Sequence, residues 1–289
     1  MKSILFPSAC LLILTSVLRG QFQTTEAASI RIQMEGIQNA EIVDRDLMVG
    51  YDQWQIGTPI FFKRTTDWTF AAGLRYQTTD LEFSDLALFA EDELHSLDLP
   101  IYLSKKHSKR LDWLLLFTPT LAGDYENINS RALNHMTIVG GKWKKSNNFE
   151  WILGALYTTR IGDDLFIPAL GLNWKPSENS NLLFAGPIIR YELKLSDSFD
   201  LFLGGQFSGN RWNTRAIYGE KLEERNFRLR AYRLSASLQW NFREPHAIFG
   251  TFGLEFGKKV EIETANGEKI LEDDASSASV YQIGYVYKF

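Results

Sequence analysis

Few side chains in this sequence are spaced for catalysis or metal binding. The four histidines are His95, His107, His135 and His246. None has the spacing of a metal-binding pair, so each is interpreted as a solvated loop residue. Ser208-Gly209-Asn210 offers a hydroxyl and an amide, but no histidine lies near it in the sequence to act as a base. Only Asp92 or Glu93 with His95 suggests an acid–histidine pair. The sequence therefore predicts no catalytic site, no metal and no cofactor, with lipase or protease activity as the alternative.

Two acidic clusters are the remaining candidates for ion binding. Glu91-Asp92-Glu93 and Glu272-Asp273-Asp274 could hold divalent cations near lipopolysaccharide. Runs of like charge are more often solvated loop tips, and that interpretation is preferred. The chain as a whole carries 31 basic and 35 acidic residues, a net charge of -4, so no basic field favours nucleic acid.

The elements that must position these residues alternate with a period of two. In 232–242, Tyr232, Leu234 and Ala236 share one face with further apolar residues, while Arg233 and Ser235 share the other. This period is that of a β-strand. The mean hydropathy of -0.19 excludes a helical membrane bundle. The 45% hydrophobic content excludes a disordered chain.

The alternation predicts twelve antiparallel strands joined mostly by short turns. They are expected at 47–63, 67–83, 93–105, 111–125, 134–145, 149–161, 165–175, 181–194, 199–210, 226–242, 247–263 and 278–289. With twelve strands, the short turns do not all fall on one side of the sheet. Two further strands, Ser29–Ile37 and part of Arg211–Tyr218, would remove this conflict, so fourteen is the alternative count.

Three features favour a membrane barrel over a soluble sandwich or lipocalin-like barrel. The predicted strands of about 11–17 residues suit a tilted bilayer crossing. The polar face is rich in Gly, Ser, Thr, Gln and Arg, whereas a soluble surface would carry mainly Lys and Glu. Tryptophans stand at strand ends, as an interfacial aromatic girdle requires. They are Trp68, Trp113, Trp143, Trp151, Trp174 and Trp240. The predicted fold is an all-β, transmembrane, antiparallel up-and-down barrel.

The first residues have the layout of a secretory signal peptide. Lys2 precedes the short apolar segment 4–18, and small residues follow. Residues 1–28 are expected to be the signal peptide and its flanking segment, with cleavage after 20, 27 or 28. Residues 29–46 would be a periplasmic segment or an extra first strand, and 47–289 the barrel. The protein is thus expected to be exported through a cleaved signal peptide.

The last strand resembles the terminal β-signal of bacterial outer-membrane proteins. A polar residue, Gln282, and Gly284 precede the aromatic residues Tyr287 and Phe289 at the end of the sequence. In that class the barrel-assembly machinery reads the final phenylalanine. The resemblance implies a Gram-negative outer membrane, with lipid, lipopolysaccharide and the assembly machinery as partners.

A narrower resemblance covers most of the barrel. Pro168-Ala-Leu-Gly171-Leu-Asn-Trp174-Lys-Pro176 follows Gly162-Asp163-Asp164 and precedes the segment Pro187–Tyr191. This pattern resembles an uncharacterised outer-membrane barrel family called domain of unknown function 6268. The resemblance implies the fold and brings no assigned activity.

The polar face of the strands is expected to line the lumen. Its charged members are Arg75, Asp98, Arg160, Arg190, Glu192, Arg233 and Glu255. Such charges either border a water-filled path or pair and close it. The predicted function is a narrow passive channel for small polar or ionic solutes, of unknown identity. The alternative is a closed structural or interaction barrel that presents loops 84–92, 211–225 and 264–277.

Overall fold

The computed structural model describes residues 29–43, 46–83, 89–126, 128–160, 164–186, 188–218 and 221–288. The predicted signal peptide, with its cleavage sites, and Phe289 of the predicted assembly signal lie outside the described residues. Within these ranges, no helix is long and apolar enough to span a membrane.

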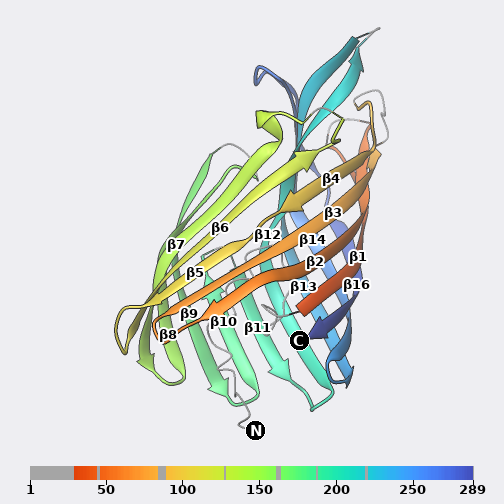
Figure 1. The fold of residues 1–289 in the computed structure, drawn as a ribbon. Coiled ribbons are helices and arrows are strands. Elements are labelled where there is room, and N and C mark those ends of the chain that lie inside the picture. Colours follow the sequence, from red (N-terminus) through yellow and green to blue (C-terminus); the bar gives the residue numbers. More distant parts are fainter. Residues whose placement is uncertain are drawn as a thin grey trace.

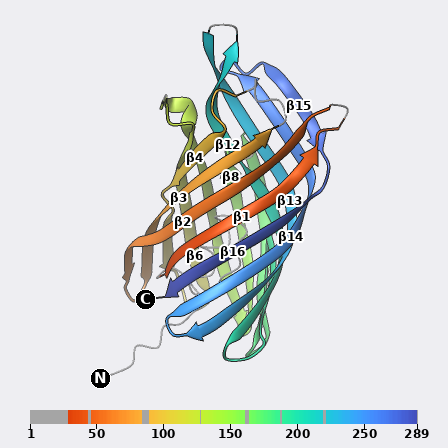
Figure 2. The same ribbon diagram turned by 90° about the vertical axis from the view of Figure 1, so that its right-hand side faces the viewer.

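The described chain folds into one sheet that closes on itself where β13 pairs with β14 (Figures 1 and 2). Its strands are β1 (Ser29–Glu41), β2 (Met48–Arg64), β3 (Trp68–Phe83), β4 (Glu93–Asp98), β5 (Ile101–Lys106), β6 (Leu111–Gly123), β7 (Leu133–Ser146), β8 (Phe149–Thr158), β9 (Leu165–Ser177), β10 (Ser180–Ala185), β11 (Ile188–Lys194), β12 (Phe199–Tyr218), β13 (Lys221–Arg243), β14 (His246–Thr264), β15 (Lys269–Ala275) and β16 (Ala278–Lys288). A 3-10 turn, η3 (Ser130–Ala132), precedes β7. The neighbours along the wall are antiparallel, which confirms the predicted all-β antiparallel barrel.

The barrel wall has fourteen strands, so the predicted count of twelve is wrong and the alternative is right. Sixteen segments form the sheet, but β4 and β5 follow one another between β3 and β6. Likewise β15 and β16 follow one another beside β14. Each of these two pairs is one wall strand with a break in it.

The two strands missing from the predicted count have different origins. β1 covers the Ser29–Ile37 segment and pairs with β2 and β16. The other arises because the segment 181–194 is two strands, with Ala185 paired to Ile188. Gly186 adopts φ +60°, a turn conformation that favours glycine. Because Ala185 and Ile188 are paired, they share a face, so the turn reverses the parity of the inward positions. Leu183 and Arg190, which are also paired, are accordingly both buried, and the predicted single strand 181–194 overlooked this change of phase. The segment Arg211–Tyr218 is no extra strand, because it continues β12.

Fourteen strands place six short turns at one end of the barrel. The turns 65–67, 107–110, 147–148, 178–179, 195–198 and 244–245 lie at the end where Ser29 of β1 pairs with Lys288 of β16. Short turns mark the periplasmic end of an outer-membrane barrel. The conflict that twelve strands created is thereby removed.

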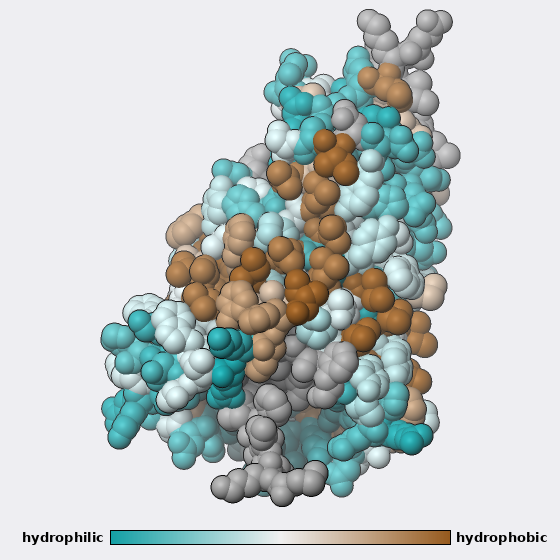
Figure 3. All heavy atoms as spheres, in the orientation of Figure 1, coloured by the Kyte–Doolittle hydropathy of each residue, from teal (hydrophilic) through white to brown (hydrophobic). Residues whose placement is uncertain are grey.

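The outer face carries an apolar band. Figure 3 shows hydrophobic side chains across the middle of one face, with hydrophilic residues above and below them. The six tryptophans of the expected girdle are all exposed. All of them flank the short turns of the periplasmic end, so they form a single belt there. Rings at this level suit the boundary between hydrocarbon and water.

The extracellular half of the barrel is narrower than the periplasmic half. β12 pairs with β11 only as far as Gly205, and its upper part crosses to β6, where Asn213 meets Gly123 in a parallel bridge. A Cβ at position 123 would collide with the carbonyl oxygen of Asn213, so only glycine permits this approach. Strands β7 to β11 are thereby left out of the upper ring, and Figure 1 shows β10 and β11 ending far below the top of the barrel.

Polar contacts support the crossing of β12. The side chain of Asn129 donates to Glu224 at 2.7 Å, and Arg215 contacts Asp124 at 3.0 Å. The backbone N–H of Ala90 donates to the carbonyl of Arg215 at 2.7 Å. Segments 211–225 and 264–277, expected to be loops, are largely strand, because the upper parts of β12, β13 and β14 continue their ladders beyond the membrane and add β15.

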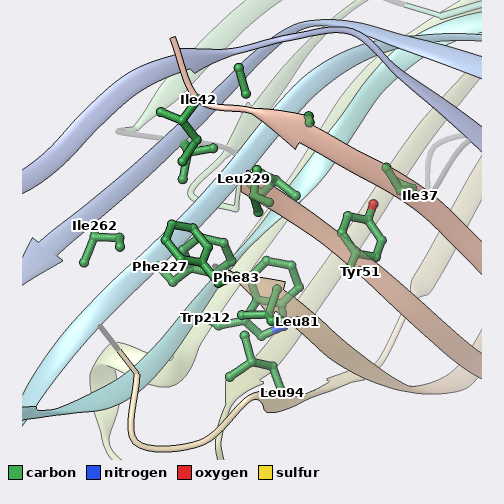
Figure 4. Packing of buried hydrophobic residues seen from close by; sticks show 14 of the residues in the cluster. Ile37, Ile42, Tyr51, Leu81, Phe83, Leu94, Trp212, Phe227, Leu229 and Ile262 are labelled. Carbon is green, nitrogen blue, oxygen red and sulfur yellow. The ribbon is translucent and has the colours of Figure 1, made fainter. Parts of the chain in front are cut away.

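An apolar cluster fills this upper ring. Nine strand segments enclose it: β12, β13, β14, β15, β1, β2, β3, β4 and β6. A ring of about eight strands is just filled by its own side chains. In Figure 4, residues from several of these strands, among them Ile37, Leu81, Phe227 and Ile262, point toward one another inside the ring. The axis of the barrel is therefore closed on the extracellular side.

The orientation of β13 gives a direct test of the fold. Leu238 is 46% exposed on the outer face, whereas Ser235 lies on the inner face beside Gly253. We expect Leu238→Arg to lower the unfolding free energy by roughly 1–2 kcal/mol, because it places a charge in the hydrocarbon one lipid-facing position above the interfacial Trp240. Ser235→Arg, the matched control on the same strand, should fold nearly normally. Urea unfolding in lipid vesicles measures both, and equal losses would contradict the membrane-facing assignment.

Candidate functional site

The barrel wall has a gap above β10 and β11. These strands have 6 and 7 residues, fewer than the roughly 9–11 that a tilted strand needs to cross the hydrocarbon. Among the described residues, β9 above Gly171 has no partner from β10, and β12 beyond Gly205 has none from β11. Two strand edges thus face each other without a ladder between them. An open edge at membrane depth is tolerated where it lines a cavity.

A cavity lies behind this gap. Its volume is about 700 Å³ including the open mouth. It runs along the free edge of β12, where Gln206, Ser208 and Asn210 alternate with Phe207 and Gly209. Its remaining lining comes from the tops of β7 and β8 and from the inner faces of β1, β2 and β13. Residues that alternate along one strand line the same cavity only if it wraps around the edge of that strand, so the cavity reaches toward both the lumen and the wall.

A four-charge cluster forms one side of the interior. Arg233 donates to both oxygens of Glu35, at 2.8 and 2.9 Å, and to Glu255 at 2.8 Å. Ser208 donates to the same oxygen of Glu255 at 2.6 Å, and the Lys258 ammonium lies 3.9 Å from its other oxygen. Two cations face two carboxylates, so this cluster is neutral.

A three-charge cluster stands near the cavity on β3, β4 and the segment after β8. Arg75 is paired with Asp98, which also accepts a hydrogen bond from Thr120 at 2.6 Å. Arg160 lies 3.4 Å from Asp98 and 3.4 Å from the side-chain oxygen of Asn210. Both separations are longer than the 2.7–2.9 Å of strong charge-assisted bonds. Two guanidinium groups share one carboxylate, so this cluster carries an excess positive charge.

The structure places all seven charged residues of the predicted lumen set inside the barrel, within three groups. Arg190, fully buried, pairs with Glu192 on β11. Arg75, Asp98 and Arg160 form the three-charge cluster, while Arg233 and Glu255 belong to the four-charge cluster. Arg190 and Glu192 do not line the cavity, whereas Arg160 and Arg233 do.

Three interior residues were not in the predicted set. Glu35 lies on β1, in the segment predicted to be either periplasmic or an extra first strand. Lys258 follows Gly257, which has a φ of +57° and lies in a β-bulge opposite Ala231. The bulge changes which side chains of β14 face inward. Extrapolated alternation cannot locate such a bulge. Asn210 was considered only for catalysis, although its alternation with Gln206 and Ser208 already placed it on the inner face.

The residues considered for catalysis are not assembled into a hydrolase site. Ser208 donates to Glu255 and not to a histidine. His95 contacts the hydroxyl of Tyr76 at 3.0 Å and lies 4.0 Å from Glu93. In the described part of the chain, no group of three acidic, His or Cys side chains could hold a metal ion. Glu272 of the second acidic cluster is paired with Lys259 and Lys269.

The predicted assembly signal lies on β16, the last strand, which pairs with the first strand, β1, and with β14. Gln282 on β16 points inward and donates to Glu35 at 3.1 Å. Gly284 faces the ring of Phe249 so closely that a Cβ would collide with it. Tyr287 packs its ring edge against His246. These contacts join the last strand to both of its neighbours, β1 and β14.

A closed antiparallel barrel with an apolar outer band and a polar interior is an outer-membrane β-barrel. Residues 53–287 match the family described as domain of unknown function DUF6268, and the chain belongs to this family, as its sequence pattern indicated. No curated protein matches the sequence.

Several solved structures are similar to this chain. The COG4313 outer-membrane channel of Pseudomonas putida F1 is similar with a TM-score of 0.51 and 12% identity, over 91% of this chain and 95% of that one. The Pseudomonas putida toluene transporter TodX is similar with a TM-score of 0.46 and 11% identity, over 98% and 94%. The KdgM porin gives 0.40 and 8%, over 90% and 99%. The similarity to the first of these structures supports the outer-membrane β-barrel fold of the chain.

The four-charge cluster should be essential for stability. Glu35→Leu leaves Arg233 buried with one carboxylate fewer, and removing one partner of a buried ion pair costs about 3–5 kcal/mol. We expect a corresponding loss in urea unfolding followed by tryptophan fluorescence. Adding Arg233→Met to Glu35→Leu should recover part of the loss, whereas Glu272→Gln, which breaks an exposed pair, should change little. An unchanged Glu35→Leu barrel would show that this cluster does not hold the strands together.

Proposed function

We propose that the protein is a narrow passive channel for small polar or ionic solutes, entered from the outside through the gap in the wall. The observation that carries this proposal is the cavity at the free edge of β12. The barrel axis is closed above by the apolar cluster, so a solute needs another path. The cavity connects the interior to the gap above β10 and β11, which is the break in the hydrogen-bonded ladder between the described residues of β9 and β12.

The interior below the cluster has the chemistry of a polar passage. Glutamines and threonines recur there, and Gln53 and Gln77 both donate to Thr79. A ring of fourteen strands is wider than the eight that side chains fill, and narrower than the porins. Neutral hydrogen-bonding groups in such a ring support passage of small polar solutes. We propose that the protein is a channel and not an enzyme. We also propose that lipopolysaccharide and the barrel-assembly machinery are its partners.

The second candidate is a closed structural or interaction barrel. The apolar cluster favours it, because it seals the axis without any moving part. The ion pairs of Arg190 and Arg233 also occupy space in the interior. The two functions differ in conductance, because only a channel gives steady current steps in a planar bilayer.

The route through the cavity can be tested by filling it. Gln206 lines the cavity, so Gln206→Trp should reduce single-channel conductance several-fold. Leu203→Trp places the same ring on the lipid-facing side of the same strand and should leave conductance unchanged. Folding of each variant is checked by heat-dependent gel mobility. No current steps from correctly folded wild-type protein would favour the closed barrel, and equal conductance of both variants would rule out this route.

The interior charges predict a preference for anions. The seven predicted residues, Glu35 and Lys258, with the buried Arg31, Lys142, Asp112 and Glu150 of the lower strands, give seven cations and six anions. A narrow low-dielectric path amplifies such an excess. A reversal potential measured across a KCl gradient should show anion preference. Arg160→Gln should weaken this preference, whereas Lys259→Gln on the extracellular part of β14 should not. Cation preference in the unmodified protein would exclude this electrostatic model.

A further inference from the structure

The cavity behind the gap is lined by both polar and apolar side chains. Met136, Leu229 and Trp212 form its apolar part. Arg160 and Asn210 contribute polar groups, and Asn210 is paired with Leu229 across the ladder between β12 and β13. A ligand that fits this cavity must match both kinds of lining.

The charge of the lining favours an anion. Its charged residues are Arg160, Arg233 and Glu35. Arg233 holds Glu35 with two short hydrogen bonds, and Gln282 also donates to Glu35, so this carboxylate is already satisfied. Arg160 shares Asp98 with Arg75, which is bound more tightly at 2.6 Å. The excess positive charge is therefore located at the Arg160 guanidinium.

A buried donor in the same place lacks an acceptor. Asn210 is 1% exposed, and its oxygen accepts from Arg160. Its side-chain nitrogen has no hydrogen-bond partner among the described residues. Leaving such a donor unsatisfied is unfavourable, so an acceptor in the cavity would stabilise this arrangement. The guanidinium and the amide nitrogen are both donors, which is the set that an oxyanion requires.

We propose that this cavity is a binding site for a small organic anion with an apolar body, a carboxylate carried on an aromatic or aliphatic group. The carboxylate accepts hydrogen bonds from Arg160 and Asn210, and the apolar body packs against Met136, Leu229 and Trp212. The proposal rests on the proposed function, because it names the solute class that the channel admits at its outer gap. A simple inorganic anion uses the donors alone and leaves the apolar part uncovered.

Binding is tested with three probes of one shape and different charge. 4-Phenylbutyrate, 4-phenylbutanol and 4-phenylbutylamine are titrated into the full-length purified barrel in detergent, and binding is followed by calorimetry. We expect saturable binding of 4-phenylbutyrate, at least tenfold weaker binding of the alcohol, and no binding of the amine. Equal binding of acid and alcohol, or no saturable binding of the acid, would overturn the proposal.

Variants locate the site. Arg160→Gln should weaken 4-phenylbutyrate binding at least tenfold, and Arg190→Gln, which removes a buried arginine outside the cavity, should not. Asn210→Asp supplies Arg160 with a second carboxylate and should abolish binding without a large change in volume, so it serves if Arg160→Gln does not fold. Unchanged binding in both cavity variants would overturn the assignment of the site.

The two proposals fail separately. Saturable, Arg160-dependent binding without current steps in planar bilayers would keep the site and reject the channel. Current steps that 4-phenylbutyrate neither blocks nor alters, together with no binding in calorimetry, would keep the channel and reject the site.

Discussion

The crossing of β12 from β11 to β6 is the constraint on which the rest of the molecule depends. In hydrocarbon every backbone donor and acceptor must be satisfied within the protein, so a wall strand that leaves its neighbour must find another. β12 does so at Gly123, where the absence of a Cβ lets the carbonyl of Asn213 approach closely. The crossing divides the barrel into a nine-segment ring above and a fourteen-strand ring below.

The interior chemistry follows from the two ring sizes. A small ring can be filled by its own side chains, so apolar residues inside it pack as in the core of a soluble protein. A larger ring is not filled in that way. Polar side chains and paired charges occupy much of it, beside small apolar clusters such as that of Leu114 and Leu116 and that of Phe249 and Val286. The change from Leu229 to Arg233 along a single strand marks the boundary between these two environments.

The same crossing creates the gap and its cavity. β12 can leave β11 only if β11 and β10 are short, and short strands leave two edges without a ladder. Arg160 and Asn210 come together at these edges from distant parts of the sequence, since Arg160 follows β8 and Asn210 lies within β12. The site therefore exists because the ladder is interrupted above β10 and β11. Its polar donors lie beside strand edges whose backbone groups also need hydrogen-bond partners.

The fold class, the lipid-facing and inward faces of most strands, and the family could be predicted from the sequence alone. These depend on local periodicity, because every second residue of a strand shares a face, and on short motifs such as that around Gly171 and Trp174. Other features were decided only by the tertiary structure. The pairing of Leu183 with Arg190 is set by the ladder between β10 and β11, and a single continuous alternation over 181–194 does not describe it. The bulge at Gly257 shifted Lys258 inward, and the neighbours of Glu35 and Arg160 come from strands far away in the chain. Periodicity reports the environment of one strand at a time, whereas closure, register and the crossing of β12 depend on which strands meet, and no local pattern encodes that.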